Sequence, residues 1–202
     1  MYLFSHFSDA YSCLPRTKRT LTIAYIPTAA LGETIDMSEY ISKNLHALES
    51  QYAVETLDLA TASTSEVADV LNRVPAVFLD GGNTFYLMHH LRRTGADAII
   101  RNRVQSNELI YLGNSAGSIV AAPDIEYCTG IETPGSKDLL KGDFTGLELV
   151  DFYPLPHLNN PWFDSRVRDV MSEYQSKIEL VPITDKQMIY LHRDSHDIAT
   201  AP

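Results

Sequence analysis

Residues 109–117 read LIYLGNSAG, an apolar run that passes at once into glycine, serine and alanine. Small residues continue to Pro123, so this stretch predicts a buried strand, a tight turn and a helix. Residues 76–84 read AVFLDGGNT and repeat the arrangement: a short buried strand, a glycine turn and the start of a helix. Two such units in succession are typical of a parallel α/β sheet.

The same alternation extends outward in both directions. Further strands are predicted at 21–26, 54–59, 152–155, 178–183 and 188–191. Helices are predicted at 35–50, 65–73, 84–93, 96–105, 116–122 and 164–176. Residues 124–145, rich in Gly, Pro, Asp and Thr, predict a long functional loop, with or without a short hairpin, and residues 194–202 show no clear strand. No repeat or linker divides the chain, so we expect one doubly wound α/β domain over residues 1–202, with a mainly parallel sheet and helices on both faces.

Composition narrows the class of protein. The chain has 202 residues, of which 45% are hydrophobic and 21% charged, which excludes a disordered chain. Its net charge of −10 argues against nucleic acid or an anionic membrane as a partner, because both favour a basic surface. No apolar run is long enough to span a membrane, and the N-terminus lacks the pattern of a signal peptide. With only Cys13 and Cys128, we expect a soluble cytoplasmic protein.

The segment Gly113–Gly117 fits the pattern G-x-S-x-G. Between a strand and a helix, this pattern is typical of a nucleophile elbow, in which the serine hydroxyl is lifted clear of the sheet. Glycines flank the serine because a tight elbow brings neighbouring backbone close. The sequence therefore predicts Ser115 as a nucleophile; the alternative is a serine that only caps the next helix.

A serine nucleophile needs a base, and His157 is the best candidate among seven histidines. It follows a predicted strand, and residues that follow strands of a parallel sheet line the crevice where ligands bind. The alternative is a half-buried histidine bonded to the backbone. His192 and His196 lie four residues apart but lack a third ligand, so no metal site is predicted.

The turn at Gly81, Gly82 and Asn83 is the second candidate element of a site. Two glycines at the end of a strand let backbone amides face the crevice, which suits an oxyanion hole or a carboxylate cradle. We expect the amide of Ala116 to face the same point. The alternative is a turn that only requires positive φ, and nucleotide binding is disfavoured because the lysine of a P-loop is missing.

Taken together, the segments Leu79–Thr84 and Gly113–Gly117 resemble the peptidase E and cyanophycinase family of serine peptidases. The family also has a proline soon after the nucleophile and a histidine in a P-H-x-N segment, which match Pro123 and residues 156–159. The opening strand ending in Ile-Pro-Thr-Ala at 26–29 fits as well. The resemblance covers residues 21–190.

This resemblance implies a fold like that of class I glutamine amidotransferases, with serine in place of their cysteine. It also implies hydrolysis of short peptides through an acyl-enzyme, without metal or organic cofactor. The third catalytic residue departs from the family pattern, because ungapped counting from Ser115 lands on Gly130. A small gap brings Glu132 to that place, and we choose it. The other candidates are Asp185, Asp124 and Glu126.

Three functions follow from these observations. The first is a serine peptidase acting on dipeptides or short peptides, in which a preference for N-terminal Asp is carried over from the family. The second is a small serine esterase of the α/β-hydrolase type. The third is an amidotransferase-like domain that binds a ligand without catalysis. A homodimer is an expectation from the family alone.

Overall fold

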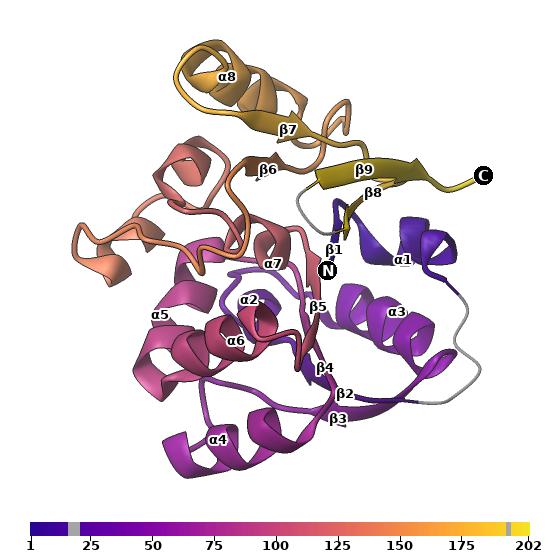
Figure 1. Cartoon of the computed structure of the whole chain (residues 1–202). Helices are drawn as coiled ribbons and strands as arrows, with labels where there is room; N and C mark the ends of the chain where they lie inside the picture. The colour runs from indigo at the N-terminus through magenta and orange to yellow at the C-terminus, as the bar shows by residue number, and fades with distance from the viewer. Residues whose placement is uncertain (16–20, 193–194) are drawn as a thin grey trace.

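A computed structural model describes residues 1–15, 21–192 and 195–202 (Figure 1). Its centre is a seven-stranded sheet with the spatial order β3-β2-β4-β5-β1-β8-β9. The strands are β1 (Tyr2–Phe4), β2 (Leu21–Ile26), β3 (Tyr52–Thr56), β4 (Ala76–Leu79), β5 (Ile110–Asn114), β8 (Gln187–His192) and β9 (Ser195–Thr200). The five strands from β3 to β1 are parallel, while β8 and β9 close one edge in antiparallel pairing.

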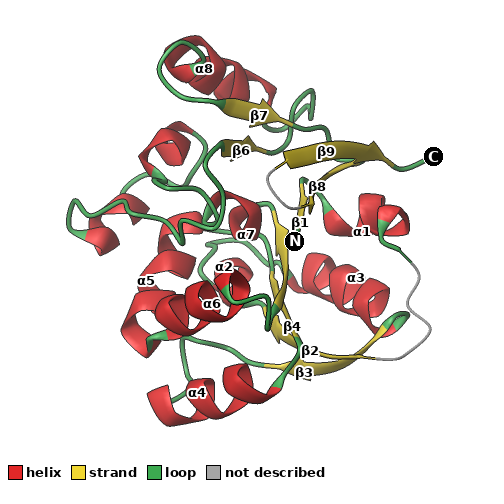
Figure 2. Cartoon of the chain, in the orientation of Figure 1, coloured by secondary structure: helices red, strands yellow, loops and turns green. Residues whose placement is uncertain are grey.

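Helices cover both faces of this sheet, as Figure 2 shows. The helices are α1 (Phe7–Ala10), α2 (Thr28–Leu31), α3 (Ser38–Glu49), α4 (Thr64–Arg73), α5 (Thr84–Thr94), α6 (Ala96–Gln105), α7 (Ala116–Ile119) and α8 (Asp164–Tyr174). One apolar core joins α1 and α3 to the sheet, and a second joins α4 to α7 to its other face. The predicted α/β class is therefore confirmed. In the described part of the chain, no helix has the length and apolarity to cross a membrane.

The strand β4 shows why the strands of the sheet could be predicted from short apolar runs. Ala76 and Phe78 face the core beneath α1 and α3, whereas Val77 and Leu79 face the opposite core. All four side chains are fully buried. A parallel strand covered on both sides has no solvent face, so its sequence is continuously apolar instead of alternating.

The C-terminal half adds a smaller layer beyond the main sheet. The strands β6 (Tyr153–Leu155) and β7 (Leu180–Pro182) pair in parallel as a separate two-stranded sheet, with α8 between them in sequence. Within the predicted loop at 124–145, two short 3₁₀ helices form, η2 (Glu126–Gly130) and η3 (Ser136–Leu140). They pack against α8 and α5, respectively.

The two ends of the chain differ from the prediction. The strand β1, with only three residues, was not anticipated, because three residues are too few to show a period. The prediction that the tail lacks a strand was wrong for residues 195–200, which form β9 against β8; Asp194 lies outside the described residues. β9 is an edge strand with mostly exposed residues, and such strands carry polar side chains that hide the signal.

Two glycines bring α7 unusually close to the sheet. A Cβ on Gly117 would lie 2.0 Å from the carbonyl oxygen of Leu79, and one on Gly113 would lie 2.4 Å from that of Gly117. The hydroxyl of Tyr111 also donates to the Gly117 carbonyl, at 2.5 Å. The elbow can therefore sit directly on β4 only if both positions lack a side chain.

We expect Gly117→Ala to lower the free energy of unfolding by roughly 1–3 kcal/mol, because the added methyl group meets backbone that cannot move aside. Urea unfolding measures the change. Gly130→Ala is the matched control, since its Cβ would meet only a Val170 methyl at 3.9 Å and should shift stability by less than about 0.5 kcal/mol. Equal stability of the two variants would contradict the close packing.

Candidate active site

The site is built around a strained serine at the end of β5. Ser115 has φ 48° and ψ −108°, a conformation that L residues adopt rarely and that costs about 1–3 kcal/mol. The backbone around it holds this conformation: its amide donates to Phe4 in β1, and its carbonyl accepts from Ser118 and Ile119 in α7. Strain of this kind, retained by surrounding hydrogen bonds, is typical of a nucleophile elbow.

His157 lies directly beside this serine. Its Nε2 is 2.8 Å from Ser115 Oγ. The histidine is 6% exposed, and its ring stacks on Phe163 with centroids 4.4 Å apart. Its backbone, at φ 67°, is held by a 2.7 Å hydrogen bond from its amide to Ser5 Oγ. The imidazole is therefore fixed from both sides in a position to accept the hydroxyl proton.

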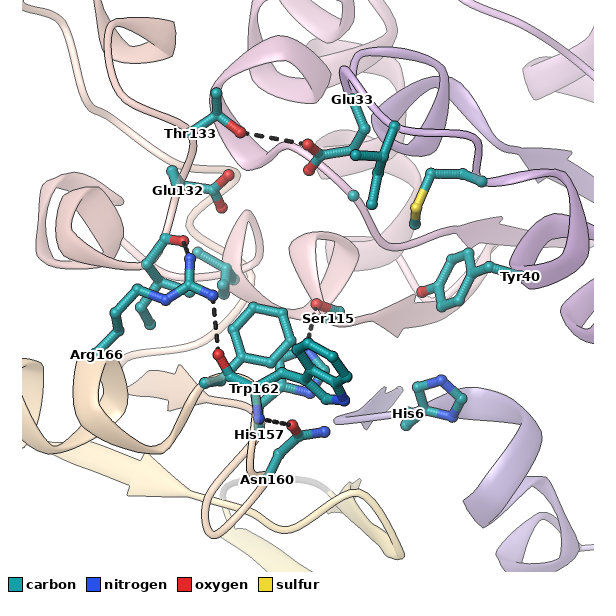
Figure 3. Close-up of a pocket in the computed structure, with 16 residues that line it drawn as sticks. His6, Glu33, Tyr40, Ser115, Glu132, Thr133, His157, Asn160, Trp162 and Arg166 are labelled. Atoms are coloured by element: carbon teal, nitrogen blue, oxygen red, sulfur yellow. Dashed lines mark hydrogen bonds between the residues drawn. The ribbon is translucent and has the colours of Figure 1, made fainter.

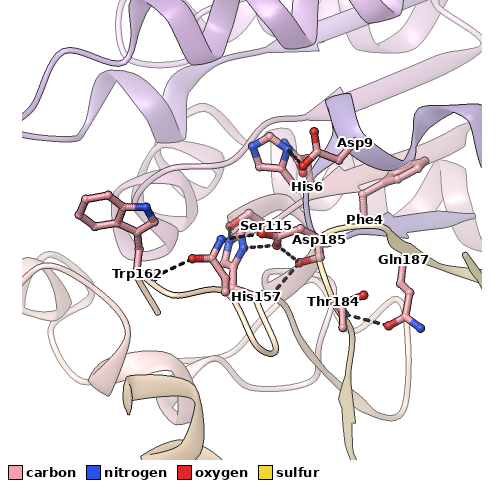
Figure 4. A network of polar contacts seen from close by, with 12 residues as sticks. Phe4, His6, Asp9, Ser115, His157, Trp162, Thr184, Asp185 and Gln187 are labelled. Atoms are coloured by element: carbon pink, nitrogen blue, oxygen red, sulfur yellow. Dashed lines mark hydrogen bonds and ion pairs between the residues drawn. The ribbon is translucent and has the colours of Figure 1, made fainter. Parts of the chain in front are cut away.

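Asp185 completes a chain of hydrogen bonds, shown in Figure 4. Its Oδ1 is 2.8 Å from His157 Nδ1 and also accepts from the Ser5 hydroxyl, while Oδ2 accepts from the Asn160 amide. Burial alone would raise the pKa of Asp185. The hydrogen bond and charge of His157 outweigh burial, and hydrogen bonds from Asn160 and Ser5 act in the same direction. Together they lower the pKa of Asp185 well below its ordinary value. Asp185 is thus kept ionised against the imidazole.

Glu132 is not where the sequence analysis expected the acid to be. It follows η2 and lines another wall of the cavity beside Thr133, whereas the carboxylate that accepts the hydrogen bond from His157 is that of Asp185. Of the other two candidates, Asp124 accepts from the amide of Glu126 in a local turn, and neither lines the cavity. Asp185 reaches His157 from the loop between β7 and β8, and counting along the chain from Ser115 could not reveal this contact.

The backbone amides of the glycine turn divide into two kinds. Those of Gly81 and Asn83 are used internally, by Asp80 Oδ1 at 2.7 Å and by Ala29 O at 3.0 Å. Asn83 also caps α5 through its side chain and does not line the cavity. The amides of Gly82 and Ala116 have no hydrogen-bond partner among the described residues. They are the two expected donors still available to an oxyanion.

A fully buried carboxylate holds this turn against the elbow. Asp80 Oδ1 accepts from Gly81 N, Asn44 Nδ2 and Asn114 Nδ2, while Oδ2 accepts from Tyr25 at 2.6 Å. Burial raises the pKa of Asp80, and these donors oppose that effect. Since Asn114 directly precedes Ser115, one carboxylate joins the two segments from which the free amides come.

Ser115 opens into a cavity of about 470 Å³. Figure 3 shows Glu132, Thr133 and Glu33 on one side of the serine, and His6 and Tyr40 on another. Asn160 and several apolar side chains also line the wall, and Trp162 stands 85% exposed at the rim.

Arg166 lines the cavity wall as well. Its guanidinium donates to the carbonyls of Ile131 and Trp162 and lies 4.7 Å from the centre of the Phe163 ring. Among the described residues that line the cavity, it is the only permanent cation. A stacked guanidinium held in this way is preorganised to bind a carboxylate.

Burial raises the pKa of Glu132 from 4.5 to about 7, although the positive charge of Arg166 acts in the opposite direction. Glu33 adds to the increase through its negative charge. Glu33 in turn accepts a hydrogen bond from Thr133 at 3.3 Å. A pair of carboxylates in a confined cavity favours a cationic ligand, which would relieve their repulsion.

Ser115, His157 and Asp185 each follow the carboxyl end of a strand, which is where parallel α/β folds bind their ligands. The model of peptidase family S51 matches residues 6–199, and the chain therefore belongs to that peptidase family. Two uncharacterised peptidases are similar over almost their whole length. One, from Listeria monocytogenes, is 33% identical over 95% of this chain and 93% of its own; the other, from Pasteurella multocida, is 32% identical over 96% and 94%.

Peptidase E relatives and solved structures agree with this placement. Peptidase E of Nostoc is 37% identical over 68% of this chain and 52% of its own. A crystal structure of a candidate peptidase E protein from Listeria monocytogenes has a TM-score of 0.88 and 31% identity, covering 100% of this chain and 98% of that one. A peptidase from an acI-B1 Actinobacterium, at 14% identity, shares the fold with a TM-score of 0.67 over 99% and 86%. The predicted family is confirmed.

Sequence reasoning missed four polar residues of the site: Ser5, Asp80, Asn114 and Asn160. Ser5 and Asn160 hold the imidazole and its carboxylate in place, and Asp80 and Asn114 hold the glycine turn. Asn114 had a signal, since it is the residue before the nucleophile. Ser5 had none, because β1 itself was not predicted.

Asp185→Asn should slow the reaction of Ser115 with a fluorophosphonate by roughly 10²–10⁴-fold, because an amide cannot stabilise the imidazolium that forms as the proton is taken. Intact mass at timed intervals measures the adduct. Glu132→Gln should slow this labelling by far less. If the two variants exchanged these effects, Glu132 would be the acid after all.

The raised pKa of Glu132 predicts a dependence of stability on pH. Between pH 4.5 and about 7 the native protein binds more protons at this group than the unfolded chain does, so the wild type loses stability as pH rises. Glu132→Gln removes this effect. We expect the variant to gain on the order of 1–3 kcal/mol relative to wild type between pH 5 and pH 8, measured by urea unfolding. A difference that is the same at both pH values would contradict the raised pKa.

Proposed function

We propose that this protein is a serine-type peptidase that hydrolyses dipeptides or other short peptides. In this proposal Ser115 is the nucleophile, His157 the general base and Asp185 the residue that orients His157. The observation that carries it is the pair of 2.8 Å contacts from Ser115 Oγ to His157 Nε2 and from His157 Nδ1 to Asp185 Oδ1. Membership of a peptidase family supports a peptide as the substrate.

In the first half of the reaction, Ser115 Oγ attacks the scissile carbonyl carbon while His157 Nε2 takes the hydroxyl proton. The carbonyl oxygen becomes an oxyanion within reach of the free amides of Gly82 and Ala116. The ionised Asp185 stabilises the imidazolium and keeps Nδ1 protonated. His157 then gives its proton to the leaving amine, the C–N bond breaks and an acyl-enzyme remains.

In the second half, water replaces the amine. The water oxygen attacks the acyl carbon while His157 takes a proton from the water. The amides of Gly82 and Ala116 stabilise the second oxyanion. The ester bond to Ser115 then breaks, and His157 returns the proton to Oγ. The products are an amine and a carboxylic acid, and the enzyme returns to its starting state without a cofactor.

The cavity wall supports a substrate with a free amino terminus. Glu132 and Glu33 supply carboxylates, and an ammonium group placed between them would offset the burial that raises the pKa of Glu132. Arg166 is suited to the side chain of an N-terminal Asp, since a guanidinium pairs with a carboxylate through two parallel hydrogen bonds. We therefore keep a preference for N-terminal Asp as part of the proposal.

A panel of dipeptides that includes Asp-Leu tests the proposal through release of free amine. We expect cleavage by the wild type and a loss of roughly 10⁴-fold or more in Ser115→Ala, with the free energy of unfolding nearly unchanged. Ser172→Ala, on the exposed face of α8, is the matched control and should cleave at the wild-type rate.

The other outcomes separate the alternatives. Cleavage that persisted in Ser115→Ala would remove the mechanism. Hydrolysis of a chromogenic ester without any amine release would favour the esterase. If folded wild-type protein bound dipeptides but cleaved none, the chain would be a binding domain.

A further inference from the structure

His6 is a second histidine at the cavity, and nothing in the mechanism above uses it. It lies two residues beyond the end of β1, after Ser5, and Phe4 at that end is paired with Asn114 of β5. The parallel register therefore brings His6 out of the sheet close to the level at which Ser115 leaves it. Its imidazole lines the same cavity, 5.7 Å from the ring of Tyr40. Figure 3 shows it on the side of Ser115 away from Glu132.

The direction of proton transfer decides which part of a peptide reaches His6. The leaving amine must come within hydrogen-bond distance of His157 Nε2 to receive its proton. His157 is bonded through its backbone to Ser5, the neighbour of His6 in the chain. The leaving residue therefore lies on the β1 side of the cavity, and the acyl residue lies toward Glu132.

The imidazole of His6 has one ring nitrogen engaged and one available. Nδ1 lies 3.3 Å from Ser8 Oγ and 3.4 Å from a carboxylate oxygen of Asp9. Nε2 has no hydrogen-bond partner among the described residues. In the tautomer whose Nδ1 accepts from the Ser8 hydroxyl, the ring carries its proton at Nε2, which can then donate to a ligand.

A carboxylate is the group that a substrate would present at this place. In a dipeptide the leaving amino acid ends in a carboxylate only one Cα beyond the scissile nitrogen, whereas a longer peptide has an amide there. The permanent cation of the cavity, Arg166, lies on the other side of Ser115 from His6 (Figure 3). A hydrogen bond from His6 Nε2 would give this carboxylate a donor on the side of the cavity opposite Arg166.

We propose that His6 binds the C-terminal carboxylate of a dipeptide substrate and so favours dipeptides over longer or C-terminally blocked peptides. This inference rests on the proposed peptidase function and specifies its substrate class. It assigns no part in the chemical step to His6, which acts on the affinity for the leaving residue.

The test compares Asp-Leu with Asp-Leu carboxamide, which differ only in the charge at this position. We expect wild type to prefer the free acid by roughly 10- to 100-fold in kcat/KM, because the carboxamide replaces a charged hydrogen-bond acceptor with a neutral one. In His6→Ala and in His6→Phe, the ratio of the two kcat/KM values should fall toward one, mainly through a higher KM for the acid. His6→Phe keeps a ring against Tyr40, so agreement of the two variants would exclude an effect of lost packing.

His46→Ala is the matched histidine control, since His46 is exposed on α3 and lines no part of the cavity. It should leave the acid-to-amide ratio at the wild-type value. Wild type that cleaves both substrates equally, or His6 variants that keep the wild-type ratio, would overturn the inference and leave the peptidase function standing. If wild type cleaves neither substrate nor any other dipeptide, the proposed function fails and this inference fails with it.

Discussion

The amide of Ser115 donates to the carbonyl of Phe4 because β1 inserts between β5 and β8 and runs parallel to β5. This pairing of a three-residue strand places the segment after it beside Ser115. Ser5 then bonds both Asp185 and the backbone of His157, which come from distant parts of the chain. A shift of β1 by one residue would turn Ser5 to the other face of the sheet and separate all three.

A second constraint acts from beneath the site. Asp80 is fully buried, and a buried carboxylate is costly unless donors surround it. Four donors do so, and two of them belong to the glycine turn and to the residue before the nucleophile. Because Gly81 N is directed to Asp80, the following amide, of Gly82, stays free at the cavity. Rigidity at the oxyanion position thus comes from a group that does not contact the cavity itself.

The residues of the site that could be predicted are those that lie in a short, recognisable segment of the sequence. Ser115 lies within a five-residue pattern between a strand and a helix, and His157 lies in a proline-rich segment after a strand. The carboxylate that contacts His157 could not be chosen from a local pattern, since several acidic residues follow Ser115 and any of them could reach a histidine. Glu132 was chosen by its place in the chain, whereas Asp185 contacts His157 because β8 pairs with β1.

The fold class and the position of Ser115 at a strand-to-helix turn were determined by the sequence itself, because strands buried on both faces must be continuously apolar and a turn packed against β4 must have glycines. Tertiary structure alone decided which carboxylate contacts His157, where Ser5 and Asp80 form their hydrogen bonds, and which amides remain free. Hydrogen bonds between residues up to 180 positions apart decide these features. Such bonds depend on strand order and register, which leave no local pattern in the sequence.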